Sequence, residues 1–132
     1  MTTDFGCAYC YGEDAQAVWT YHRNGGLEPQ RRIVDDPHFL VSLRHCRRCG
    51  QVFVSIFTEF VDWEGGDDAQ YSDVVPVTPA EAATVLEQGE QVDLRYLGSL
   101  GEGRRRLSSD WPTGGETEIG WRVGTFWVEQ GH

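Results

Sequence analysis

The sequence predicts an α+β fold that is mostly β, with one helix packed on an antiparallel sheet. Several segments alternate apolar and polar residues with the two-residue period of a strand, and one stretch, beginning at Thr78, has the capping residues of a helix. Aromatic residues make up 12% of the chain, which favours a folded, β-rich protein over a disordered one. A chain of 132 residues is long enough to form one domain around its own hydrophobic core.

All four cysteines occur in two C-x-x-C pairs, Cys7/Cys10 and Cys46/Cys49. A C-x-x-C turn places two sulfurs on the same side of the chain, and a structural zinc ion takes its four ligands from two such pairs. The sequence therefore predicts one zinc site with Cys7, Cys10, Cys46 and Cys49 as the metal ligands. Four cysteines fill the coordination shell, so we expect a structural ion and no catalysis at the metal. Gly50 follows the second pair, where a chain that wraps back toward the thiolates needs a positive φ angle.

Other interpretations of the cysteine pairs are two disulfides or a redox dithiol. Disulfides would suit a secreted chain, but the N-terminus has no export signal. A redox C-x-x-C is expected near a strand-helix-strand pattern, which neither pair shows. Two histidines are further candidates. His22 is either a ligand or the polar tip of a strand, and His45 either hydrogen-bonds a thiolate or is exposed on a turn.

The segment from Cys46 to Gly50, with a strand-like run on each side, resembles the knuckle of a zinc ribbon, and Cys7 to Gly12 resembles its partner knuckle. The resemblance covers about residues 5–63 and implies a zinc ion gripped between two β-turns. It implies no activity, because zinc ribbons occur in transcription factors, enzyme appendages and interaction modules alike. The 35 residues between the two pairs leave room for extra strands. We expect residues 1–132 to form a single domain, with the helix and the closing strands at about 76–130.

The first half of the chain predicts four strands, one of them short. Residues 17–23 alternate and predict the first, which ends at a turn at 24–26. Residues 27–38 predict a connection with a short strand at 31–34. Residues 39–44 predict the strand that enters the second knuckle, and residues 52–63 predict its hairpin partner, buried on both faces in its first half. Tyr9 and Tyr11 are expected to flank the metal site.

Residues 64–68 form a turn with a dense negative charge, close in sequence to Asp62 and Asp73. We interpret the segment Asp62–Asp73 as a solvated acidic loop. A calcium or magnesium site and a docking surface for a basic partner are the alternatives, although the segment lacks the EF-hand pattern.

The one predicted helix spans residues 79–88. Thr78 is a good N-cap, Pro79 suits the first helical position, Glu81 completes a capping box, and Gly89 ends the helix. Its apolar stripe should lie on the sheet and consists of Ala82, Val85 and Leu86.

The C-terminal third predicts two strands and a basic cluster. Residues 92–97 predict a short strand, 98–103 a loose glycine-rich loop, and 119–128 a closing strand with two tryptophans on one face. We expect these tryptophans to pack against the helix as core, the alternative being an exposed interaction site. The cluster Arg104–Arg106 is expected to neutralise the acidic loop of its own chain, the alternative being a phosphate or an acidic partner.

No motif for nucleotide binding, nucleophilic catalysis or a catalytic metal is present, so we expect no enzyme activity. The formal net charge of −10 opposes binding to nucleic acid and favours a protein partner with a basic face, as for an inhibitor or immunity-type protein. The alternatives are a nucleic-acid-binding zinc ribbon, since Arg44, Arg47 and Arg48 surround the second knuckle, and a C-x-x-C redox protein. Reduced thiols without an export signal indicate the cytoplasm, and no apolar run is long enough to span a membrane.

Overall fold

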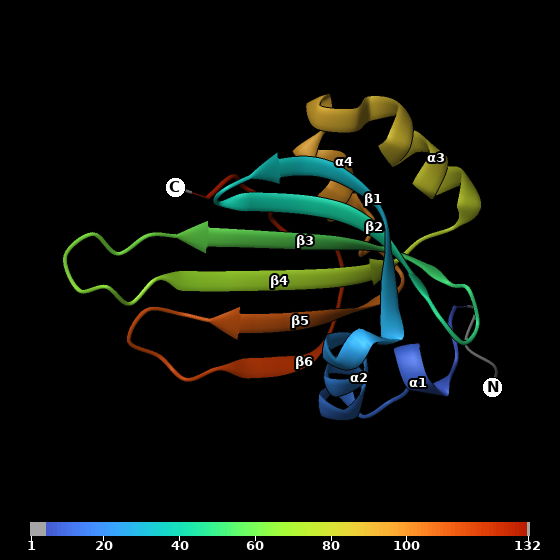
Figure 1. The fold of residues 1–132 in the computed structure, drawn as a ribbon, viewed down its shortest axis with the longest axis horizontal. Coiled ribbons are helices and arrows are strands. Elements are labelled where there is room, and N and C mark those ends of the chain that lie inside the picture. The colour runs from blue at the N-terminus through green and yellow to red at the C-terminus, as the bar shows by residue number, and fades with distance from the viewer. Residues whose placement is uncertain (1–4, 132) are drawn as a thin grey trace.

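The computed structural model describes residues 5–131, and these contain six strands in one antiparallel sheet. The strands lie in chain order, so that each pairs with the next (Figure 1). They are β1 (Leu27–Asp36), β2 (Phe39–Cys46), β3 (Val52–Phe60), β4 (Ala69–Pro76), β5 (Arg105–Trp111) and β6 (Glu118–Val123). The predicted α+β class, dominated by antiparallel strands, is confirmed.

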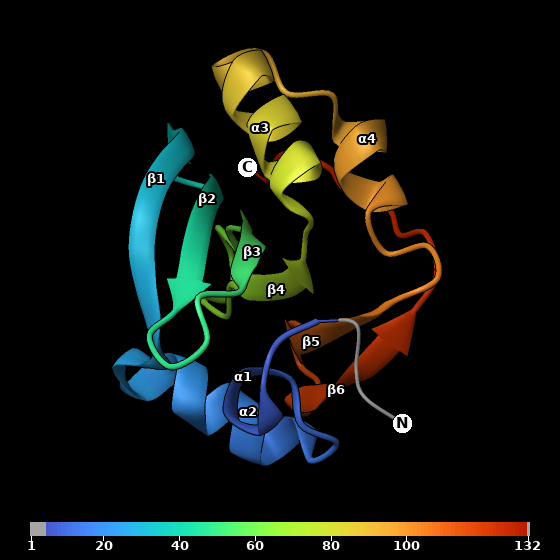
Figure 2. The ribbon, with the colours of Figure 1, turned by 90° about the vertical axis from the view of Figure 1, so that its right-hand side faces the viewer.

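Four α-helices in the described part of the chain lie on two sides of the sheet (Figures 1 and 2). They are α1 (Ala8–Tyr11), α2 (Ala15–Tyr21), α3 (Pro79–Gln88) and α4 (Leu94–Ser99). The pair α3 and α4 covers one face, whereas α1 and α2 lie together at the end of the molecule where β1 begins and β6 ends. The sequence predicted one helix, so the number of helices was underestimated. None of the described helices has both the length and the apolar character needed to cross a membrane.

The main hydrophobic core lies between the sheet and the helices α3 and α4. Successive side chains of a strand point to opposite faces, so Val41 of β2 and Val54 of β3 enter this core while their neighbours do not. Val85 of α3 and Leu97 of α4 are completely buried there. The capping box predicted at the start of α3 is present, but Leu86 is 41% exposed and lies outside the buried stripe.

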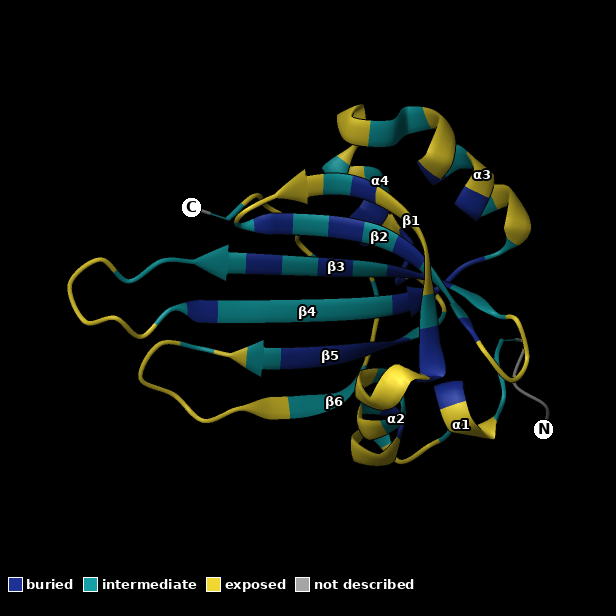
Figure 3. Ribbon diagram, in the orientation of Figure 1, coloured by how far each residue is buried: buried dark blue, intermediate teal, exposed yellow. Residues whose placement is uncertain are grey.

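The predicted hairpin around the second cysteine pair is confirmed as β2 and β3. Its register pairs Leu43 with Val54 and His45 with Val52, which leaves the second C-x-x-C at the turn. Phe53 belongs to a second cluster on the other side of the sheet and Val54 to the main core, so the start of β3 is buried on both faces as expected. The burial colours in Figure 3 show the same alternation along β2.

Two predicted strands are helices in the structure. Residues 17–23 lie in α2 and in the wide helical turn η1 (His22–Gly26), because Asp14 caps the helix by accepting a hydrogen bond from the Ala17 amide. Residues 92–97 fall largely in α4, where Asp93 caps in the same way by accepting from the Arg95 amide. In contrast, the short strand predicted at 31–34 is part of the ten-residue edge strand β1, whose register shifts accommodate Pro29.

The C-terminal strands differ from the prediction in their limits. β4 and β5 were missed, and β6 ends at Val123 because Gly124 turns the chain with a φ angle of 111°. Neither of the two tryptophans packs against α3 as expected: Trp121 is partly buried against Tyr11 of α1, with ring centroids 5.1 Å apart. Trp127 is 83% exposed, so it lies outside the core altogether.

The three arginines of the cluster Arg104–Arg106 each bind a different part of their own chain. Arg104 pairs with Glu81, and Arg105 donates hydrogen bonds to backbone carbonyls near the first cysteine pair. Arg106 pairs with Asp73 at 3.0 Å. The predicted neutralisation of the segment Asp62–Asp73 therefore holds for Arg106 alone.

The acidic loop folds around its own carboxylates. Asp62 accepts hydrogen bonds from the amides of Glu64, Gly65 and Asp67, and Asp68 accepts one from the Asp62 amide. These bonds hold the pKa of Asp62 below its usual value. Asp73 lies apart, in β4, so the carboxylates of the segment do not converge on one point.

Candidate metal centre

The four cysteine sulfurs meet at one end of the sheet, although 35 residues separate the two pairs. All four sulfurs lie within 4.8 Å of one another. The Sγ atom of Cys7 is 3.7 Å from that of Cys10 and 3.9 Å from that of Cys46, and Cys10 Sγ is 3.7 Å from Cys49 Sγ. The structure therefore brings together the four residues that the sequence predicts as ligands, and within residues 5–131 they form the only such group of side chains able to hold a metal.

These distances fit a tetrahedral ion. A zinc–sulfur bond of about 2.3 Å gives an edge of about 3.8 Å between two sulfurs of a regular tetrahedron. The three sulfur–sulfur separations of 3.7–3.9 Å given above match that edge. None of the four cysteines forms a disulfide, so all four sulfurs are free to bind. The geometry suits a metal such as zinc.

The first cysteine pair lies on a single turn of helix, in contrast to the β-turn that the zinc-ribbon resemblance implied. Cys7 is the N-cap of α1, and its amide donates a hydrogen bond to Cys10 Sγ at 3.2 Å. Gly6 precedes this turn with a φ angle of 66°, and a Cβ atom there would lie 2.8 Å from Cys10 Sγ. Only glycine allows the chain to pass so close to the sulfur.

The second cysteine pair lies on the turn between β2 and β3, as predicted. The Gly50 amide donates to the Cys46 carbonyl at 2.8 Å, and Gly50 has the expected positive φ angle of 81°. Gln51 then connects the two knuckles. Its side-chain oxygen accepts from the Gly6 amide at 3.1 Å, while its side-chain amide donates to the carbonyls of Val52 and Val77.

Tyr21 of α2 reaches the centre directly, with its hydroxyl 3.2 Å from Cys46 Sγ. Burial alone would raise the pKa of the Cys46 thiol, but hydrogen bonds from the Tyr21 hydroxyl and from the backbone around Cys49 lower it to about 7. The Cys10 thiol has the opposite shift, because burial and the nearby Cys46 and Cys49 sulfurs raise its pKa. Four thiolates cannot share so small a volume without a cation, and a divalent ion removes that repulsion.

The carbonyls at the end of α1 are also bound by side chains. His22 Nε2 lies 3.1 Å from the Cys10 carbonyl, so this histidine supports the first knuckle through its backbone. Arg105 donates to the Tyr11 carbonyl at 2.8 Å, and its guanidinium stacks on the Tyr11 ring. The Tyr9 ring packs at a tilt against the Tyr21 ring and lies under Arg48, so the expectation that Tyr9 and Tyr11 flank the cysteines is met.

The second candidate histidine, His45, points elsewhere. Its Nε2 atom lies 3.4 Å from a carboxylate oxygen of Glu28 on β1, and the same carboxylate contacts Arg47. The suggested hydrogen bond from His45 to a thiolate is therefore replaced by the one from Tyr21. Sequence spacing favoured His45 because it precedes Cys46, whereas Tyr21 approaches from a helix 25 residues away.

Comparisons of the chain with protein-family models, with curated proteins and with solved structures find no match. The interpretation of the centre therefore depends on its own geometry.

Proposed function

We propose that Cys7, Cys10, Cys46 and Cys49 bind one structural zinc ion and that the protein acts as a zinc-stabilised, non-enzymatic binding module. The observation that carries the metal assignment is that all four sulfurs lie within 4.8 Å of one another and that three of their separations, 3.7–3.9 Å, match the edge of a zinc–thiolate tetrahedron. With four thiolates bound, no coordination position is left for water or a substrate. A zinc-ribbon-like clasp, made of one helical knuckle and one hairpin knuckle, would then join α1 to the sheet.

The thiol environments support a metal role over a redox role. A redox C-x-x-C needs an exposed thiol with a lowered pKa. Cys46 has the lowered pKa but is only 1% exposed, whereas Cys49 is exposed but has a raised pKa owing to burial of its sulfur. Neither pair combines the two properties.

The metal assignment is tested by the variant Cys49→Ser, which removes one thiolate at an exposed position and leaves the core intact. We expect the purified protein to hold one zinc ion per chain and Cys49→Ser to lose it to a chelator at least tenfold more easily. Arg48→Ser is the matched control, because it is exposed in the same turn and carries no sulfur. Equal zinc retention by the two variants, or no zinc in the native protein, would contradict the assignment.

The proposed partner is a protein with a basic face, and the supporting feature is an acidic end formed by two loops. We define the acidic end as residues 61–68 and 112–118, which contain six carboxylates and no basic residue. The loops are joined by hydrogen bonds from Thr113 and Gly114 to Asp67. Trp63 projects from this end and is 83% exposed, and an exposed tryptophan among charges is a typical anchor in protein interfaces.

The partner proposal is tested by capture from the native cell, with the wild type and the variants Trp63→Ala and Glu64→Lys as baits. A genuine partner has a basic surface, binds less tightly as salt is raised, and is lost with both variants. Leu86→Ala, which removes another exposed apolar side chain on α3, is the control and should retain the partner. A partner whose binding is indifferent to salt and to both variants would refute the proposed surface.

A further inference from the structure

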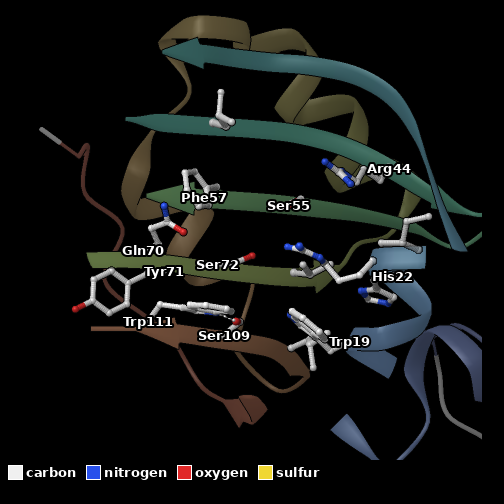
Figure 4. A pocket seen from close by; sticks show the side chains of 15 residues that line it. Trp19, His22, Arg44, Ser55, Phe57, Gln70, Tyr71, Ser72, Ser109 and Trp111 are labelled. Carbon is white, nitrogen blue, oxygen red and sulfur yellow. Dashed lines mark hydrogen bonds between the residues drawn. The ribbon is translucent and has the colours of Figure 1, made fainter. Parts of the chain in front are cut away.

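The sheet face opposite α3 and α4 is hollowed into an open cavity of about 620 Å³ (Figure 4). Its floor consists of side chains from β2 to β5, and one end is closed by α2 and the turn after it. Small-molecule sites in proteins occupy about 300–1,000 Å³. The cavity therefore has the volume of a ligand site, and it is separate from the four cysteines.

The floor of the cavity contains polar side chains that the sheet register aligns in a row. Ser72 of β4 lies opposite Phe57 on one side and opposite Ser109 on the other. Ser109 is only 4% exposed, and its hydroxyl oxygen accepts a hydrogen bond from the Trp111 indole at 3.0 Å. Each serine hydroxyl has both a donor and acceptor sites, so this row offers hydrogen bonds to a polar ligand.

The charge of the lining is opposite to that of the whole chain. The chain has 21 acidic residues against 11 arginines, yet the cavity lining contains Arg23 and Arg44 and no carboxylate. Within residues 5–131 neither of these two arginines forms an ion pair, whereas five others do. A guanidinium without a carboxylate partner in a partly enclosed site is suited to bind a phosphate or carboxylate group.

Aromatic rings line the same cavity. Trp19 of α2 lies near His22 at one end, with Arg44 across the cavity from it (Figure 4). Trp111 lies over β4 and β5 toward the other end, close to Gln70 (Figure 4). The Trp111 ring is held by its hydrogen bond to Ser109 and is 46% exposed, so one part of it remains accessible. Flat aromatic faces stack on planar rings such as those of nucleobases.

We propose that this cavity binds a small organic anion that carries a planar ring and has about the size of a mononucleotide. Arg44 and Arg23 hold the anionic group at the α2 end, the ring stacks on Trp111 beside Phe57, and the serine row binds polar atoms between them. The proposed ligand site is distinct from the candidate metal centre, because no cysteine lines the cavity.

Isothermal titration of the metal-loaded full chain tests the proposal with three ring-bearing anions: AMP, UMP and phenyl phosphate. Adenosine and inorganic phosphate serve as the two halves of such a ligand. We expect at least one of the three anions to bind with one-to-one stoichiometry and at least about tenfold more tightly than either half. The variant Arg44→Gln should weaken that binding about tenfold or more, as the loss of a charge-assisted hydrogen bond does.

Arg31→Gln is the matched control, because it removes the same charge from an exposed position outside the cavity. It should leave the affinity unchanged. Arg23→Gln, at an exposed position, should reproduce the effect of Arg44→Gln without a change in the melting temperature. The proposal is overturned by an absence of saturable binding for all three anions. It is also overturned if inorganic phosphate binds as tightly as they do, or if Arg31→Gln weakens binding as much as Arg44→Gln.

Discussion

At the scale of single residues, the hydroxyl of Tyr21 is the clearest support of the metal centre from outside the cysteine pairs. It lies 3.2 Å from Cys46 Sγ and favours the thiolate by donating a hydrogen bond. The variant Tyr21→Phe keeps the ring that packs against Gly26 and Tyr9 and removes only this bond. We expect zinc to be lost to a chelator roughly tenfold faster, since partners of metal ligands typically account for 10–100-fold in affinity.

The control for this change is Tyr9→Phe. Tyr9 stacks on the same Tyr21 ring but has no hydroxyl contact to a sulfur among the described residues. It should leave the rate of zinc loss unchanged, as measured with a chromophoric chelator. If the two variants release zinc at the same rate, the hydroxyl of Tyr21 has no part in holding the metal.

The residues of the candidate centre divide into those that local sequence predicts and those that it does not. The four cysteines and Gly50 follow from spacing and backbone conformation, which are local properties. Tyr21 and Gln51 do not, because their contacts depend on how α2 and the end of β4 come to lie beside the knuckles. No spacing rule in the sequence relates a tyrosine to a cysteine 25 residues away.

At the scale of elements, the start of α3 depends on the bidentate pair of Arg104 and Glu81. Burial opposes ionisation of Glu81, but hydrogen bonds from Arg104 and from the Thr78 amide outweigh it and lower the pKa of Glu81 below its usual value. A lowered pKa in the folded state adds stability above the unfolded pKa, and this is lost as the pH falls through the folded pKa. We expect Glu81→Gln to reduce the free energy of unfolding by roughly 1–2 kcal/mol at pH 7.

The difference in the free energy of unfolding between Glu81→Gln and the wild type should therefore shrink as the pH is lowered below about 4.5. Urea unfolding followed by circular dichroism measures this difference. Glu87→Gln, an exposed position on the same helix, is the control and should cost less than about 0.5 kcal/mol at either pH. If Glu81→Gln and the wild type differ in free energy of unfolding by the same amount at pH 7 and at pH 3, the carboxylate charge does not stabilise the helix start.

The elements that sequence predicted well are those whose signals are local and strong. The helix α3 has a complete capping box, and the hairpin of β2 and β3 has apolar alternation on both sides of a turn. The errors occurred where the local signal was ambiguous. Residues 17–23 alternate in polarity like a strand, yet most of them lie in the short helix α2. Asp14 caps this helix, and Val18 is its buried residue. β4 contains several polar residues, and the sequence did not predict it as a strand. In the structure, β3 and β5 pair with it on both sides and hold these residues in the sheet.

At the scale of the whole molecule, the described chain has two hydrophobic clusters that depend differently on the metal. The main cluster lies between the sheet and the helices α3 and α4 and contains none of the cysteines. The second cluster contains Cys10 and Cys46 together with Tyr11, Leu27 and Phe53. A metal ion at the sulfurs would therefore stabilise the second cluster directly and the main cluster only through the strands that they share.

Removal of the metal should accordingly loosen one end of the molecule first. Without a divalent ion, the raised pKa of Cys10 keeps its thiol protonated at neutral pH, and the contacts that join α1 to the sheet are weakened. We expect chelation to abolish hydrogen-exchange protection in α1, α2 and residues 47–51, while the amides of β2 to β4 that face the main cluster stay protected. Stability overall should fall by about 4 kcal/mol if free zinc had stood at 1,000 times its Kd. Equal loss of protection in both regions would mean that the two clusters unfold as one cooperative unit and that the metal stabilises the entire fold.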